Sequence, residues 1–426
     1  MTALGHIAPG ERLSAALTAA RSNSAQAVEF LRRHRVVGLG ASRLLDPPGA
    51  SAEGEVGDMV TRRRTLSALL ADAWRELELT VAETGVAAAG IKGYSTVGLY
   101  ARPEHRDIGD IDLLVDDVDD AWNLAGRLRE QGYDWCEYEL PWLKRDGRSG
   151  QIYGQVQVWK HVGEIPVRVD VHFGGYSIRH CRLAPHRLDQ KGLHTLDAMS
   201  NLPFLLGNAA GDFLIKLKDV NDIVLMLEAD PKLDWRQSMD EIRAHGLAAF
   251  WNALLDEVTR TSQLSARAQA IAEELRVDGV KPERVPFGRP EWRARCRATV
   301  ADSYRAGRRE RGFAAGLSLA WSAYRYYRRP LKLAVQARCA HGRKDLSLVD
   351  RMRNDVCVRL VPTRLIRERS AGSPQDTPPA AAQHAVPGTD ALRVETADGH
   401  AFVRAAGEAF VPTVYYNLCE AQGGYR

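Results

Sequence analysis

The sequence lacks the motifs that mark several common classes of protein. Its six cysteines are scattered without a C-x-x-C pair, which argues against a zinc ribbon or a disulfide framework. It has no P-loop and no H-E-x-x-H motif. Gly38 and Gly40 resemble the start of a dinucleotide fingerprint, but Arg43 stands where its third glycine should be.

The sequence also lacks long apolar runs. The longest candidates, 202–206 and 248–255, are far shorter than a membrane span, and the first residues lack the apolar core of a secretion signal. We therefore expect a cytoplasmic protein with reduced thiols and no membrane span. A length of 426 residues is enough for two or three domains with a sizeable core.

The most informative run is DIGDIDLLV at residues 107–115. It places Asp110 and Asp112 two residues apart among apolar side chains. On a strand these carboxylates would share a face, where their repulsion raises the pKa of one of them. A bound divalent cation removes that cost, and oxygen ligands suit Mg²⁺. The alternative is a strand end with both carboxylates in water.

A third carboxylate follows in residues 151–173, where alternating residues on both sides of Gly163-Glu164 predict a β-hairpin. Asp170 and His172 fall on its polar face, from which Asp170 would meet Asp110 and Asp112 across neighbouring strands. Three carboxylates can hold two Mg²⁺ ions that activate a hydroxyl and neutralise a triphosphate. The alternative for Asp170 is an exposed position on an edge strand.

Several motifs occur in a fixed order over about residues 60–260: Lys92-Gly93, Arg106, Asp110 to Val115, Asp170-Val171-His172, and Asp219-Val220-Asn221-Asp222. This pattern resembles the uncharacterised nucleotidyltransferases of the DNA polymerase β-like superfamily. The resemblance implies an α+β nucleotidyltransferase fold, with a small mixed sheet, flanking helices, and helical N-terminal and C-terminal parts. It also implies transfer of a nucleotide monophosphate from an NTP. By cellular abundance alone, ATP is the default donor.

The triphosphate site departs from the pattern of the wider superfamily. A Gly-Ser pair usually begins the helix before the aspartates, whereas this chain has Gly93-Tyr94, with Ser95 one step later. Backbone N–H groups at a helix start bind phosphate without that serine, and Lys92 would add a charge. We expect Lys92, Gly93 and Ser95 to contact the triphosphate. The alternative for Lys92 is a surface lysine.

Three further residues are candidates for nucleotide binding. Arg106 would clamp a phosphate or orient the aspartate pair, or it is an ordinary surface charge. His172 shares a face with Asp170, so it would support the metal ligands or hydrogen-bond the nucleotide. By resemblance, Asp222 would help to hold the nucleotide, or it would pack the helical part against the catalytic sheet.

The chain divides by composition and pattern into a helical part (1–85), the catalytic core (86–190), a helical domain (191–285), a basic helical segment (286–369), a flexible linker (370–390) and a small C-terminal β segment or tail (391–426). In the helical domain, apolar spacing predicts one helix from Phe213 to Leu227 with a surface ion pair between Lys216 and Asp219.

The basic segment has a charge unlike that of the rest of the chain. Residues 289–369 hold 21 Lys and Arg against 7 Asp and Glu, whereas the whole chain has a net charge of +4. Aromatic residues are interleaved with these charges. This composition is typical of a surface for nucleic acid or another anionic partner. The alternative is a set of solvated amphipathic helices with their aromatic residues in a core.

Together these features predict a Mg²⁺-dependent nucleotidyltransferase that adds an NMP, by default AMP, to a hydroxyl or phosphate of a small molecule or peptide, as in natural-product biosynthesis. One alternative is a toxin-like or regulatory enzyme that modifies tRNA or protein. Another is a catalytically silent scaffold that binds nucleotide, although three intact carboxylates argue against it.

Overall fold

The structure is a computed structural model that falls into two compact units. Unit 1 comprises residues 1–74, 90–111 and 195–298, and unit 2 comprises residues 75–89, 112–194 and 299–426. Within these ranges the structure describes residues 24–44, 55–136, 139–145, 151–178, 181–183, 188, 190–229, 234–288, 296–297, 300–301, 304–305, 308, 312–328, 358–364, 383–385, 390, 392–397 and 400–413.

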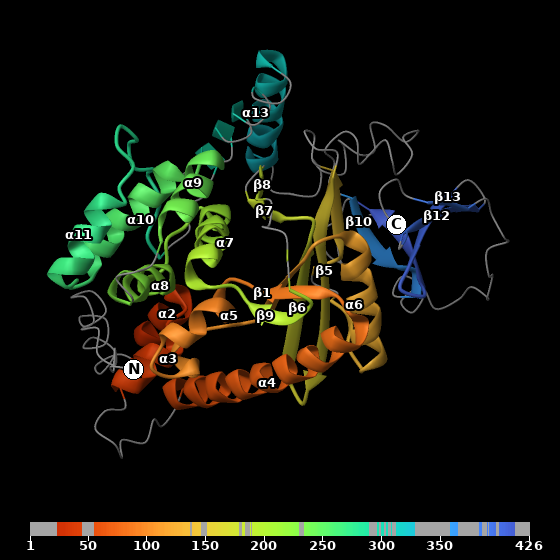
Figure 1. Cartoon of the computed structure of the whole chain (residues 1–426), viewed down its shortest axis with the longest axis horizontal. Helices are drawn as coiled ribbons and strands as arrows, with labels where there is room; N and C mark the ends of the chain where they lie inside the picture. The colour runs from red at the N-terminus through yellow and green to blue at the C-terminus, as the bar shows by residue number, and fades with distance from the viewer. Residues whose placement is uncertain are drawn as a thin grey trace. The chain divides into compact units, whose positions relative to one another are not determined.

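Unit 2 is built around a mixed sheet of twelve described strands in the order β11-β12-β13-β14-β10-β4-β5-β6-β2-β1-β9, with β3 paired to β5 (Figure 1). The predicted mixed sheet with flanking helices is confirmed, although this sheet is larger than expected. Its strands are β1 (Ala87–Gly90), β2 (Ile111–Val115), β3 (Asp134–Trp135), β4 (Trp142–Arg145), β5 (Ile152–Val162), β6 (Ile165–Phe173), β9 (Gly192–Thr195), β10 (Val358–Pro362), β11 (Gln383–Ala385), β12 (Arg393–Ala397), β13 (His400–Ala405) and β14 (Glu408–Thr413). Strands β7 (Tyr176–Ile178) and β8 (Cys181–Leu183) form a separate pair.

Strands β5 and β6 form the hairpin that the alternating sequence predicts. Gly163 has a φ of 61°, a left-handed conformation that glycine adopts without a steric cost, and it lies in the turn. The antiparallel register places Gln157 opposite Asp170 and Gln155 opposite His172. Opposed residues of an antiparallel pair point to the same face of the sheet, so these four side chains share one face.

Helix α6 (Val118–Glu130) packs against β5 and β6. It begins at Val118, where the Asp117 carboxylate caps the helix by accepting a hydrogen bond of 2.9 Å from the Asp120 backbone N–H. Its buried face carries Trp122, whose ring lies 5.4 Å from that of Trp135 and 5.3 Å from that of Phe410. These three aromatic side chains join the helix to the sheet and to its C-terminal strands.

The C-terminal strands extend the sheet at β4. Strand β10 pairs antiparallel with β4 on one side and with β14 on the other. From β14, Glu408 accepts a hydrogen bond of 2.7 Å from the Trp135 indole and lies 2.9 Å from the Arg129 guanidinium. The described part of the C-terminal β segment is therefore paired into the body of unit 2. The basic segment, expected to be helical, contains the buried strand β10 as well as helix α13 (Phe313–Arg328).

Unit 1 is mainly helical, and helix α4 crosses the boundary between the units at residues 74 and 75. A core of six buried residues joins the first helices to α8: Val28, Leu31, Val36, Val37, Met59 and Leu217. His34 Nδ1 also accepts a hydrogen bond of 3.2 Å from the Leu217 N–H. The helices that contribute to this unit are α2 (Ser24–His34), α3 (Val37–Leu44), α4 (Glu55–Thr84), α5 (Gly93–Thr96), α7 (Ala198–Asp212), α8 (Leu217–Glu228), α9 (Arg236–Ala244), α10 (Ala248–Thr261) and α11 (Ala266–Glu274), with short 3₁₀ turns at Val97–Leu99 and Pro103–His105.

The helix predicted from Phe213 to Leu227 begins four residues later than expected. Phe213 has a φ of 52° at the end of α7, so its backbone leaves the helical region there. Helix α8 begins at Leu217, where the Asp219 carboxylate accepts a hydrogen bond of 2.8 Å from the Lys216 N–H. The predicted ion pair is also replaced, because Lys216 lies 2.6 Å from Asp212 and Asp219 pairs with Lys218.

Most of the basic segment 289–369 and of the linker 370–390 lies outside the described residues, as do the first 23 residues. Of the helices that the structure describes, none combines the length and the apolar character that a membrane crossing requires.

We predict that Phe410→Ala strongly destabilises unit 2. The Phe410 side chain is 0% exposed and contacts two tryptophans, so its loss should lower the free energy of unfolding by about 3–5 kcal/mol. Urea denaturation followed by tryptophan fluorescence measures the change. Phe313→Ala, at a position 63% exposed, is the control and should change stability by less than about 0.5 kcal/mol. Equal effects of the two substitutions would contradict the packing of β14.

Candidate functional site

Strand β6 places Asp170 and His172 on the same face, and β5 supplies the amides that hold Asp170. Gln155 Nε2 donates a hydrogen bond of 2.9 Å to Asp170 Oδ2, and Gln157 Nε2 donates to Oδ1. Each carboxylate oxygen therefore has a neutral donor. These two hydrogen bonds fix the orientation of the Asp170 carboxylate on its strand.

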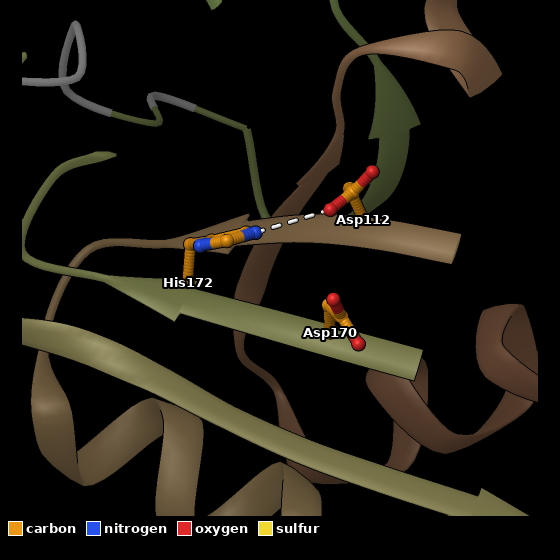
Figure 2. A group of neighbouring side chains, drawn as sticks. All are labelled: Asp112, Asp170 and His172. Atoms are coloured by element: carbon orange, nitrogen blue, oxygen red, sulfur yellow. Dashed lines mark hydrogen bonds and ion pairs between the residues drawn. The ribbon is translucent and has the colours of Figure 1, made fainter. Parts of the chain in front are cut away.

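Strand β2 brings Asp112 to the same place (Figure 2). His172 Nε2 lies 3.1 Å from Asp112 Oδ1, and one donor atom from each of Asp112, Asp170 and His172 lies within 4.8 Å of the others. The three residues are 7%, 5% and 3% exposed. Figure 2 shows the imidazole directed from β6 toward Asp112, with Asp170 on the same strand as the histidine.

The charges of this group favour a divalent cation. Two carboxylates that are buried close together repel each other and lose their hydration, which is costly unless a positive charge is present. Gln157 Oε1 is also buried and has no hydrogen-bond partner among the residues described. Buried polar atoms are nearly always paired, so this oxygen suits a site that holds an ion with its water. The group is the single metal-competent cluster found in the described part of the chain.

Asp110 lies outside this cluster, although the sequence paired it with Asp112. Strand β2 begins at Ile111, so Asp110 precedes the strand rather than alternating with Asp112 along it. Its side chain is half-buried, and it belongs to unit 1. That Asp110 binds metal stays a prediction, whereas Asp112, Asp170 and His172 are brought together.

Lys92 has a strained backbone that one side chain holds in place. Its φ of 55° and ψ of −123° lie in a region that residues with a Cβ rarely adopt. The Asn201 side chain brackets this residue, since Oδ1 accepts from the Lys92 N–H at 2.6 Å and Nδ2 donates to the Lys92 carbonyl at 2.9 Å. Asn201 is 0% exposed, so both hydrogen bonds are shielded from water.

The residues after Lys92 form the short helix α5. Gly93 is its first residue, and a Cβ there would lie only 3.3 Å from Ile108. The Ser95 hydroxyl donates a hydrogen bond of 2.5 Å to the Gly90 carbonyl. Ser95 therefore anchors the turn in this structure. The predicted contacts of Lys92, Gly93 and Ser95 with a triphosphate stay predictions.

Arg106 and Asp222 form a buried ion pair in unit 1. Arg106 Nε and Nη2 donate to the two oxygens of Asp222 at 2.8 and 2.7 Å, and the Tyr100 hydroxyl donates to Oδ1 at 2.7 Å. The Asp222 carboxylate is thus paired with two side chains of its own unit. That Arg106 and Asp222 contact nucleotide stays a prediction.

Arg63 holds the loop between Arg106 and Ile108 from α4. Its guanidinium donates to the carbonyl of Ile108 and, at 2.7 Å, to that of Arg106, and it lies 3.3 Å from Asp107. Asp107 in turn accepts hydrogen bonds of 2.7 and 3.0 Å from the N–H groups of Val37 and Gly38 at the start of α3. Buried charges therefore fix the segment that leads to β2.

Sequence reasoning missed Asn201, Gln155 and Gln157. Asn201 lies inside a helix more than one hundred residues from Lys92, and no local pattern links the two. The glutamines did carry a signal, because they alternate with valines on the strand opposite Asp170.

The comparisons with known proteins give one match. Residues 22–261 match the model of a family described as uncharacterised nucleotidyltransferase. No curated protein and no solved structure matches the chain. The family match spans more than half of the 426 residues, so the chain belongs to this nucleotidyltransferase family.

We predict that Asn201→Ala destabilises unit 1 through the backbone of Lys92. The substitution leaves the Lys92 N–H and carbonyl without their partner, which should cost about 1–3 kcal/mol. The cost should be smaller in a Lys92→Gly background, because glycine adopts a positive φ without strain. Urea denaturation of the two single variants and the double variant measures this coupling. An Asn201→Ala protein as stable as wild type would contradict the role of this side chain.

We predict that the stability contributed by Lys218 rises with pH. Burial lowers the pKa of Lys218 to about 8, whereas an unfolded lysine titrates near 10.4. Between these values the unfolded chain binds the extra proton, so alkaline pH favours folding. The unfolding free energy of wild type relative to Lys218→Met should rise by roughly 2–3 kcal/mol from about pH 8 to pH 10. Lys281→Met, at an exposed position, is the control for the removal of a lysine elsewhere in the chain. A constant difference between wild type and Lys218→Met would refute the prediction.

Proposed function

We propose that this member of the nucleotidyltransferase family transfers a nucleotide monophosphate from an NTP, by default ATP, to a hydroxyl or phosphate of an acceptor and releases pyrophosphate. The observation that carries the proposal is the buried pair of carboxylates, Asp112 and Asp170, which meet within 4.8 Å together with His172. A family match alone would also be found for a homologue that has lost its catalytic activity. Two carboxylates buried this close together repel each other, and a bound divalent metal would offset that cost.

The residues present fit a divalent metal, and we propose that Asp110, Asp112 and Asp170 hold two Mg²⁺ ions. When bound, such ions lower the pKa of the attacking hydroxyl and neutralise charge on the triphosphate and the leaving pyrophosphate. The chain's own contribution is to fix the carboxylates. Gln155 and Gln157 orient Asp170, and His172 lies against Asp112. Asp170 would accept the proton of the acceptor hydroxyl.

We further propose that Lys92, Gly93 and Ser95 bind the triphosphate. The strained Lys92 backbone supports this role, because backbone strain is concentrated at functional positions and Asn201 is dedicated to holding it. Arg106, His172 and Asp222 are the remaining candidates for nucleotide contacts.

The acceptor that we propose is a small molecule or a peptide. The basic segment 289–369, with 21 Lys and Arg against 7 Asp and Glu, favours tRNA or another anionic macromolecule as the second candidate. Incubating the purified chain with each α-³²P-labelled NTP, Mg²⁺ and a cell extract fractionated into small molecules, peptides, proteins and RNA distinguishes the two. Label in one fraction identifies the acceptor class. Bound nucleotide without transferred label would favour a silent scaffold.

We predict that Asp112→Asn, Asp170→Asn and Asp110→Ala each abolish label transfer while the fold is kept. Losing a metal ligand removes several kcal/mol of transition-state stabilisation, which is roughly a thousandfold in rate. Initial rates of transfer measure the loss, and circular dichroism checks folding. Asp240→Asn is the control, because this carboxylate is 79% exposed in a surface ion pair, and it should retain full activity. Transfer that persists in Asp112→Asn would refute the metal site.

A further inference from the structure

We propose that His172 is itself a metal ligand, so that Asp112, Asp170 and His172 form a mixed oxygen and nitrogen site that prefers a first-row transition ion such as Mn²⁺ to Mg²⁺. This inference deepens the proposed function and rests on it for the presence of a divalent ion. It assigns His172 to the metal rather than to the nucleotide.

The first support is the convergence of three donor atoms from two strands. The 3.1 Å between His172 Nε2 and Asp112 Oδ1 is close to the spacing, about 3 Å, of neighbouring ligands around one ion with bonds near 2.1 Å. An ordinary hydrogen bond would explain that pair alone. It would not explain why Asp170, whose oxygens already accept from two glutamines, also lies within 4.8 Å of both atoms.

The second support is the burial of the two carboxylates. Asp112 and Asp170 are 7% and 5% exposed, and a divalent ion bound between them would offset the repulsion of two such groups held close together. Gln157 Oε1, buried beside Asp170 and without a partner among the described residues, is a further acceptor that a metal-bound water would satisfy.

The third support is the chemistry of nitrogen donors. Mg²⁺ is a hard ion that favours oxygen ligands, whereas imidazole suits transition ions, whose affinities rise from Mn²⁺ toward Cu²⁺. The Tyr176 and His172 rings pack in a T-shaped arrangement, with centroids 4.9 Å apart and planes inclined by 66°. This contact fixes the imidazole plane, as the neighbours of metal-binding histidines commonly do.

Mn²⁺ binding to the full chain tests the proposal without turnover. We expect wild type to bind Mn²⁺ at least tenfold more tightly than Mg²⁺, in a titration that follows the EPR signal of free Mn²⁺ with Mg²⁺ as competitor. Bound Mn²⁺ should show a ¹⁴N coupling in pulsed EPR. His172→Gln should lose this coupling and bind Mn²⁺ about ten- to a hundredfold more weakly, with Mg²⁺ affinity changed less than about threefold.

His172→Gln keeps an amide that can donate to Asp112, so a histidine that only orients this carboxylate would be replaced without loss. His161→Gln is the matched control, since His161 is exposed on the neighbouring strand β5, and it should behave as wild type. If His172→Gln does not fold by circular dichroism, His172→Asn takes its place. Should neither variant fold, the wild-type ¹⁴N coupling and the Mn²⁺ preference decide the question.

A wild-type complex without ¹⁴N coupling, coupling that survives in His172→Gln, or equal affinities for Mn²⁺ and Mg²⁺ would each overturn the proposal. These outcomes are separate from failure of the proposed function. Label transfer with Mg²⁺ that is lost in Asp112→Asn would keep the nucleotidyltransferase even if His172 proved not to be a ligand. Failure to bind any divalent ion would overturn both metal assignments.

Discussion

The candidate metal site depends on the register between β5 and β6. Gln157 lies opposite Asp170 and Gln155 opposite His172, so the amides, the carboxylate and the imidazole all share one face. A shift of one residue would turn Asp170 toward the other face and bring Val169 or Val171 into its place. Valines that are 0% exposed on the opposite face prevent that shift, because it would bring them out of the core. Hydrophobic packing therefore sets the geometry of the polar site.

Unit 1 depends on buried polar interactions of a different kind. Arg106 with Asp222, Arg63 with Asp107, and Asn201 with Lys92 all fix backbone segments rather than pack apolar surface. Such groups give little net stability, since desolvation offsets most of their attraction, but losing one partner leaves the other buried and unpaired. They make one conformation of the loops much more favourable than the alternatives. That precision is needed where a chain must hold a reactive phosphate in line with an acceptor.

The sequence predicted β2, β5 and β6 because these strands have local signals. Alternation identified β5 and β6, and the aspartate pair pointed to β2. What it could not predict depends on contacts between distant residues. Asn201 reaches Lys92 across more than one hundred residues, and α8 begins at Leu217 because the backbone turns at Phe213, which has no sequence signature of its own. The pairing of β10 with β4 is equally non-local. The basic residues in the sequence around β10 led to the prediction of a helical segment there instead.

The pairing of β10 with β4 also means that the sheet of unit 2 can be completed only late in protein synthesis. Strand β10, which pairs with the edge of β4, is synthesised more than two hundred residues after β4. Glu408, the hydrogen-bond partner of the Trp135 indole, is synthesised later still. Until then the nascent chain carries an open strand edge and an uncovered aromatic surface, both of which promote association with other chains. Contacts of such long range slow folding. Production of this protein should therefore be more sensitive to chaperone supply and to translation rate than its helical unit alone would suggest.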